Sequence, residues 1–231
     1  MQFKSTDTEK NKTKEVILFT AGNLFLSQGY RKTTVRQIAD ILDTSPGLIT
    51  YYYPAKKEMA IELEQLQLSC FIRLTHQYVS QKDHPVLYSA VLTKLKWSVM
   101  TSPLFRQFHL DCLREGFFYE AAIQSGISTH RRIAEKYNLH MSDTELSLYG
   151  NYIYSGVAHI LALESEKGKF PLDAIPNAMF KASIGRILND EELLERACQE
   201  ADVVVKRILL EHTELLCGWS NSSGQKSALN G

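Results

Sequence analysis

The chain has 231 residues, with 26 lysines and arginines against 26 aspartates and glutamates. This length allows one domain or two, and the balanced charge excludes a basic field over the whole surface. No apolar run approaches the roughly 18 residues that a membrane span requires, so we expect no membrane partner. The four cysteines form no Cys-x-x-Cys pair and are expected to be reduced thiols of a cytoplasmic protein.

The charges are unevenly distributed along the sequence. Residues 1–60 contain nine lysines and arginines against six acidic residues, whereas the remainder carries an excess of acidic residues. A small basic part on a neutral-to-acidic body suits a protein that binds nucleic acid through one end of its chain.

A first helix is expected from about residue 10 to residue 27, where apolar side chains recur at helical spacing. Gly29 would end it as a left-handed cap. Three lysines lie near its start, namely Lys10, Lys12 and Lys14. They are interpreted either as a solvated face of the helix or as contacts to a neighbouring phosphate.

Residues 33–53, TTVRQIADILDTSPGLITYYY, predict two short helices joined by a three-residue turn. Thr34 and Gln37 have the spacing of a capping box at the start of the first helix. After the polar turn, Ser45 can cap the second helix and Pro46 occupies its first position. This is the plan of a helix-turn-helix, whose second helix enters the major groove of DNA. The alternative is a helical hairpin that serves packing alone.

This stretch resembles the DNA-binding domain of TetR-family transcriptional regulators. The resemblance covers about residues 10 to 62. It rests on Phe25, Gly29-Tyr30, the Thr-Thr-Val-Arg-x-Ile-Ala opening at residues 33–39, Ser45-x-Gly47, the three tyrosines at 51–53, and Lys56-x-Glu58-Met59. It implies a DNA-binding transcriptional regulator with a three-helix N-terminal domain.

The helix-turn-helix arrangement places the start of its second helix toward the groove, where Leu48 would contact a thymine methyl and Thr50 a base edge or phosphate. The family resemblance further implies that Arg36 reaches a base and that Lys56 grips a phosphate. The expected DNA-binding set is Thr33, Thr34, Arg36, Thr44, Ser45, Pro46, Gly47, Leu48, Thr50, Tyr51, Tyr52 and Lys56. The chain departs from the family pattern at Asp43, Leu48 and Thr50, where the family commonly has glycine, a small hydroxylated residue and tyrosine.

The rest of the chain is predicted to be helical, so the expected fold class is all-α. Pro54 ends the second short helix, and a long amphipathic helix follows from about residue 55 to residue 80. Further helices are expected at about 85–100, 103–113, 117–137, 143–167, 172–188 and 191–217. We divide the chain into a helix-turn-helix DNA-binding domain (1–54), a larger helical effector-binding and dimerisation domain (55–219) and a disordered tail (220–231).

Aromatic side chains are frequent in the larger domain and suggest a pocket between helices, although each of them can equally pack in the core. The family resemblance implies a small-molecule effector in this domain. Its expected lining is Trp97, Phe105, His109, Cys112, Tyr119, Tyr152 and His159. The identity of the effector stays open. His109 and Cys112 are two possible metal ligands one turn apart, but no second cluster completes a site, so we expect no metal and no cofactor.

Two of the expected helices favour a homodimer. Gly150, Ser155 and Gly156 in the helix at 143–167 would let another helix approach closely, and the last helix carries a broad apolar surface. As in the family, such C-terminal helices would pair across a two-fold axis; packing within one chain is the alternative. Two DNA-binding domains about 34 Å apart would read a palindromic operator.

These features together favour a dimeric repressor that a small-molecule effector releases from a palindromic DNA operator. An activator or a partner-controlled regulator of the same fold is the first alternative. An all-α ligand carrier or enzyme is the second. An enzyme is not expected, because none of the seven histidines follows a glutamate by three residues, as a di-iron bundle requires, and no Gly-rich phosphate loop occurs.

Overall fold

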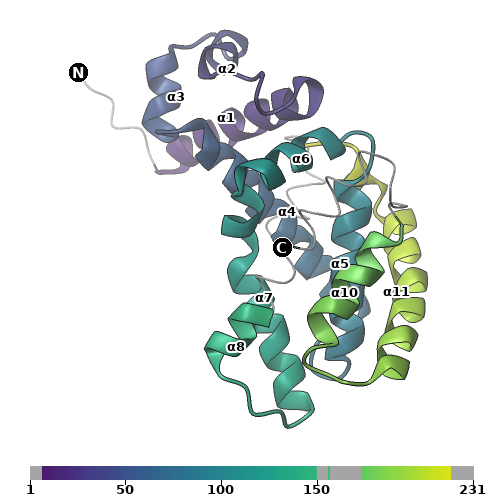
Figure 1. Ribbon diagram of the computed structural model, residues 1–231. Helices are drawn as coiled ribbons and strands as arrows, with labels where there is room; N and C mark the ends of the chain where they lie inside the picture. Colours follow the sequence, from purple (N-terminus) through teal and green to yellow (C-terminus); the bar gives the residue numbers. More distant parts are fainter. Residues whose placement is uncertain (1–6, 150–155, 157–172, 220–231) are drawn as a thin grey trace.

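The computed structural model describes residues 7–149, 156 and 173–219, and only the backbone of residues 7 and 118–126. Every regular element in these ranges is helical, which confirms the all-α fold class (Figure 1). The expected disordered tail at 220–231 and most of the helix expected at 143–167 lie outside the described residues. None of the described helices combines the length and the apolar character that crossing a membrane requires.

The first three helices form a small group at one end of the molecule, which we call the head (Figure 1). They are α1 (Asp7–Gln28), α2 (Val35–Ile41) and α3 (Pro46–Tyr52). The remaining helices form the body. They are α4 (Lys56–Tyr78), α5 (Pro85–Met100), α6 (Arg106–Glu115), α7 (Phe117–Lys136), α8 (Asp143–Ser147), α10 (Ile175–Ile184) and α11 (Glu191–Glu211), followed by the 3-10 turn η2 (Thr213–Leu216).

The central helix of the body is α5, which is buried along nearly its whole length. It packs against α4 and α7 and also against α10 and α11. Its sequence is apolar on all sides, so burying it removes a large apolar area from water. Lys94 lies in the middle of this helix, and its ammonium group donates hydrogen bonds to the Cys198 carbonyl (2.6 Å) and the Asp202 carboxylate on α11. A buried lysine needs such partners, and these fix α11 along α5.

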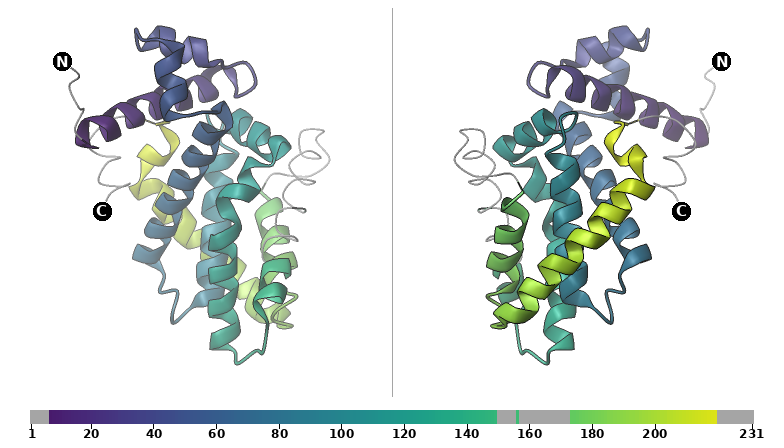
Figure 2. Two further views of the ribbon diagram at one scale, coloured as in Figure 1. Left: turned by 90° about the vertical axis from the view of Figure 1, so that its left-hand side faces the viewer. Right: turned by 90° about the vertical axis from the view of Figure 1, so that its right-hand side faces the viewer.

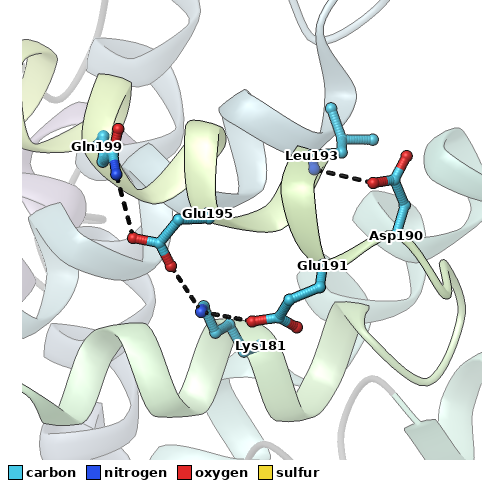
Figure 3. A network of polar contacts seen from close by, with 6 residues as sticks. All are labelled: Lys181, Asp190, Glu191, Leu193, Glu195 and Gln199. Carbon is cyan, nitrogen blue, oxygen red and sulfur yellow. Dashed lines mark hydrogen bonds and ion pairs between the residues drawn. The ribbon is translucent and has the colours of Figure 1, made fainter.

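The turn between α10 and α11 is held by a polar network (Figure 3). Asp190 caps α11 by accepting a hydrogen bond from the Leu193 N–H (2.9 Å), and acidic residues follow in the first turn of the helix. Lys181 of α10 forms ion pairs with Glu191 and Glu195, each at 2.7 Å. These groups are exposed, so each pair contributes little to stability, but together they set the register of α10 against α11.

The predicted helix boundaries differ from the structure in two places that matter for the site. The helix expected from residue 103 begins at Arg106, because residues 101–105 form turns that bury Phe105. The last helix, expected to reach residue 217, ends at Glu211. After η2 the chain turns at Gly218, which has a left-handed backbone (φ +84°), and brings Trp219 against Gly22 of α1.

The start of α4 lacks a side-chain cap, because Ala55 occupies the N-cap position with extended backbone angles. Serine there would offer its hydroxyl oxygen to the free N–H groups of the first turn. We expect Ala55→Ser to raise the free energy of unfolding by about 0.5–1 kcal/mol, measured by urea denaturation. Thr34→Ala removes a cap that is present and should lower it by about 1 kcal/mol. A change of the same sign in both variants would contradict this account.

Candidate DNA-binding site

The head presents α3 as its outermost short helix, held by its ends and by one buried side (Figure 1). The Leu48 N–H donates to the Ser45 hydroxyl (3.3 Å), and Pro46 occupies the first helical position, as the sequence predicted. Ile49 is fully buried in the core, and Tyr53, directly after the helix, is buried beside Lys14 of α1 and Glu62 of α4. The opposite side of α3 therefore faces solvent.

Three side chains expected to read bases lie on that exposed side. Tyr51 is 68% exposed, and Leu48 and Thr50 are also exposed. The Thr50 hydroxyl is close to the carbonyls of Pro46 (3.2 Å) and Gly47 (3.1 Å), so it can donate to its own helix while its methyl group points outward. This surface combines apolar groups and hydroxyls, which suits thymine methyls and base edges.

Gly47 lies at the exposed start of α3. A Cβ atom at this position would meet only the Ser45 hydroxyl, at an ordinary contact distance of 3.7 Å. The chain itself therefore tolerates a side chain here, and the benefit of glycine is closer approach by a partner.

The two short helices are joined as the sequence predicted. The Gln37 N–H donates to the Thr34 hydroxyl (3.2 Å), and the Thr34 N–H donates to the Gln37 side-chain oxygen (2.8 Å), which completes the capping box. Asp43 adopts a left-handed backbone (φ +49°), a conformation that aspartate tolerates better than most residues. Arg36, in the first turn of α2, is exposed.

Thr33, expected among the DNA-binding residues, is only 1% exposed. Its hydroxyl donates to the Gly29 carbonyl (2.9 Å) and accepts from the Gln28 side chain (3.2 Å). This side chain closes the connection between α1 and α2, so its position in the structure is a supporting one.

Lys56 was expected to grip a phosphate, but its ammonium group is engaged within the head. It donates to the carbonyls of Tyr30 (2.7 Å) and Thr33 (2.8 Å) and lies 4.1 Å from the centre of the Tyr30 ring. Burial lowers the pKa of Lys56, an effect that Glu115 and Asp111 oppose. The side chain therefore locks the α1–α2 connection onto the start of α4. The unpaired N–H groups of that helix start remain available to an anion.

The three lysines at the start of α1 differ in their surroundings. Lys14 pairs with Glu62 of α4 (2.9 Å) and lies 5.1 Å from the centre of the Tyr53 ring, so it joins α1 to α4. Lys10 and Lys12 are exposed, which fits a solvated face and a phosphate contact equally.

Of the residues expected to line an effector pocket, Trp97, Phe105, His109 and Cys112 are all buried. The Phe105 ring contacts both Trp219 (5.3 Å between ring centroids) and the His109 ring (6.0 Å). The His109 ring donates through Nδ1 to the Glu64 carboxylate (2.7 Å), which also lies beside Cys112. The pKa of the Cys112 thiol is raised by burial and by Glu64. The side chain of Tyr119, and all of Tyr152 and His159, lie outside the described residues.

Sequence reasoning missed the buried polar groups around His109. Glu64 and Gln67 on α4 and Lys96 on α5 are all buried. Burial lowers the pKa of Lys96 to about 8, against the opposing effect of Glu64. The Nε2 atom of His109 and the Oε1 atom of Gln67 have no hydrogen-bond partner among the described residues. The sequence of α5 contained the signal that could have revealed these buried groups, because a lysine in a helix that is otherwise apolar on every side must be buried.

Metal ligands do not gather anywhere in the described part of the chain. No group of three or more histidine, cysteine, aspartate and glutamate residues there is arranged to hold a metal ion.

Residues 17–63 match the family model of the bacterial regulatory proteins of the tetR family. The match runs from the middle of α1 to the first turns of α4 and includes all of α2 and α3. Residues 17–63 therefore form a TetR-family DNA-binding domain. Comparisons with curated proteins and with solved structures give no match.

The match indicates which partner the exposed surface of α3 binds. The TetR-family domain is a DNA-binding domain, so this regulator is a DNA-binding transcriptional regulator, and the helix-turn-helix is not a mere packing unit. The match does not extend beyond α4, so the arrangement of the regulator's body rests on the structure alone.

The contacts of Lys56 in this TetR-family head generate a stability prediction. Lys56→Ala leaves two backbone carbonyls without their donor, so we expect the free energy of unfolding to fall by about 1–3 kcal/mol in urea denaturation. Lys57 is the matched control, because it is adjacent and exposed. Lys57→Ala should change stability by less than about 0.5 kcal/mol. Equal losses in both variants would show that the carbonyl contacts contribute nothing.

Proposed function

We propose that this protein is a homodimeric repressor that binds a palindromic DNA operator and is released from it by a small-molecule effector. The observation that carries the proposal is the exposed side of α3, where Leu48, Thr50 and Tyr51 face solvent while Ile49 anchors the opposite side. A short helix with one anchored side and one side free for bases is what major-groove reading requires.

In the proposed complex the head divides its contacts between bases and phosphates. Arg36 reaches a guanine, for which its planar, doubly donating side chain is suited. Leu48 and Thr50 contact base edges. Thr34, Tyr52 and the start of α4 contact phosphates, with Lys56 holding that helix start in place. Thr33 supports the head from within.

The proposed dimer uses the outer side of α11. Val203 and Leu210 are 71% and 70% exposed, and their spacing of about two helical turns places both on the same side of the helix. The inner side of α11 is already buried against α5 and α10. Pairing the outer sides of two copies would remove these side chains from water. One head makes few contacts, and two heads about 34 Å apart read successive turns of the groove.

The proposed effector acts on the buried polar groups of the body. His109 and Gln67 each have a buried atom without a partner among the described residues, and such atoms are costly unless a ligand or water satisfies them. His109 lies on α6, next to Phe108, whose ring stacks on Phe25 of α1 with centroids 5.7 Å apart. A ligand that shifts α6 would therefore shift the head, and its preference for the shifted state drives release.

The division of DNA contacts can be tested with duplexes selected from random DNA by the wild-type protein. We expect Arg36→Ala to reduce the preference at one base pair by about tenfold or more, since a two-pronged arginine–guanine contact carries about 1–3 kcal/mol. Lys56→Ala should weaken binding to selected and random duplexes alike. Fluorescence anisotropy titrations at two salt concentrations would measure both. Equal losses on selected and random DNA for both variants would refute this division.

The dimer interface can be tested by adding charge to the outer side of α11. We expect Val203→Glu with Leu210→Glu to convert the dimer to monomer in analytical ultracentrifugation, because the paired helices would bury four like charges. Ile41→Glu is the matched control, since Ile41 is an exposed apolar residue on the head. A wild-type monomer, or a variant that remains dimeric, would contradict the interface.

A further inference from the structure

The segment after α11 inserts a tryptophan between the head and the body. Trp219 is only 7% exposed. Its indole packs edge to face on Phe105 (5.3 Å between ring centroids) and on Phe108 (5.2 Å), both from the α6 side. Phe108 in turn stacks on Phe25 of α1. The indole thus lies where α1 of the head meets α6 of the body.

On the head side, α1 makes room for the indole with a glycine. A Cβ atom on Gly22 would lie 2.6 Å from the Cε3 atom of Trp219, closer than real contacts allow. It would also lie 3.2 Å from the Leu63 side chain. Gly22 is inside a helix, where glycine is less favourable than alanine. Its presence there is explained by the close approach of the indole.

The backbone just before Trp219 also allows the indole to insert against α1. Gly218 has a left-handed backbone (φ +84°), and a Cβ atom there would contact Leu26 of α1 at 3.4 Å and Leu104 at 3.5 Å. Helix α11 runs from the far end of the body toward the head, and its end at Glu211 and the turn η2 leave this segment close to α1 (Figure 2). Two segments that are distant in the sequence, α1 and the segment after η2, therefore have complementary shapes where they contact each other.

We propose that Trp219 is a wedge that fixes the angle between head and body and thereby acts as a positioning residue for DNA binding. The wedge itself follows from contacts within the chain, and its consequence for DNA rests on the proposed function. With the indole in place, α1 cannot rock on α6 without disturbing either the contact at Gly22 or the aromatic contacts with Phe105 and Phe108. Without the indole, the space beneath α1 is empty and the head is free to tilt.

The wedge can be tested by hydrogen exchange of the full-length protein without DNA. We expect Trp219→Ala to speed exchange of the α1–α3 amides by at least about tenfold, because a large buried aromatic group is lost at one interface only. Amides of α5 and α11 should keep their wild-type rates. Leu216→Ala is the control in the same segment, because Leu216 is partly exposed; it should leave all rates unchanged. No change in the head, equal acceleration throughout, or the same effect from Leu216→Ala would overturn the proposal.

A second variant keeps the test decisive if Trp219→Ala does not fold. Gly22→Ala in the wild-type background should speed exchange in α1–α3, because the new Cβ displaces the indole. In a Trp219→Phe background, whose smaller ring leaves room, the same substitution should have a weaker effect or slow exchange, since alanine favours the helix. An effect of equal size and sign in both backgrounds would overturn the wedge.

The positioning role has its own readout on DNA. Wild type is used to select palindromic duplexes, and a matched set carries one extra central base pair. We expect the variant that folds, Trp219→Ala or Gly22→Ala, to lose at least about half of the wild-type discrimination between the two spacings, because tilting heads tolerate altered spacing. Unchanged discrimination would overturn the positioning role. If wild type selects no DNA, the proposed function fails, while hydrogen exchange still decides whether the wedge exists.

Discussion

The packing of α1 against α6 is the contact on which the geometry of the molecule depends. Phe25 and Phe108 stack across it with their rings nearly parallel, and Tyr30 extends the aromatic contact to Phe117 at the start of α7. An ion pair between Arg31 and Glu115 closes its exposed edge. Because the head joins the body through this contact and through α4, any change in the position of α6 is transmitted to α1. The orientation of α3 toward a partner therefore depends on residues that lie far from α3.

Buried polar groups make the interior of the body different from a plain apolar core. The Lys94 contacts with α11 are fully satisfied and serve the fold, whereas the Glu64–His109 pair leaves one ring nitrogen without a partner among the described residues. Satisfied groups of this kind fix one packing arrangement, and unsatisfied ones carry a cost that another molecule can relieve. The two sides of the body therefore differ. The polar groups between α5 and α11 stabilise the fold, whereas those near α4 and α6 lie on the side of the body that contacts the head. The proposed effector belongs on the second side for that reason.

Head and body share one continuous hydrophobic core, which runs from α1 through α4 and α5 to α11. The division of the chain at residue 54 remains a useful description of function, but the core does not stop there. The Lys56 ammonium and the Lys14–Glu62 pair tie the head to the start of α4 at two further points. The head is therefore a part of the structure whose position is set by its contacts with the body, rather than a domain on a linker.

The helices of the head follow from the residue pattern. The capping box at Thr34 and the cap and proline at Ser45 and Pro46 each depend on interactions within a few residues, so their spacing alone predicts them. Which long side chains are free for a partner depends instead on how the helices pack. Lys56 contacts Tyr30, and Trp219 contacts Gly22. The two residues of each pair are far apart in the sequence, so no local sequence pattern predicts these contacts. These contacts depend on how the helices pack, and packing brings together residues that the linear order keeps apart.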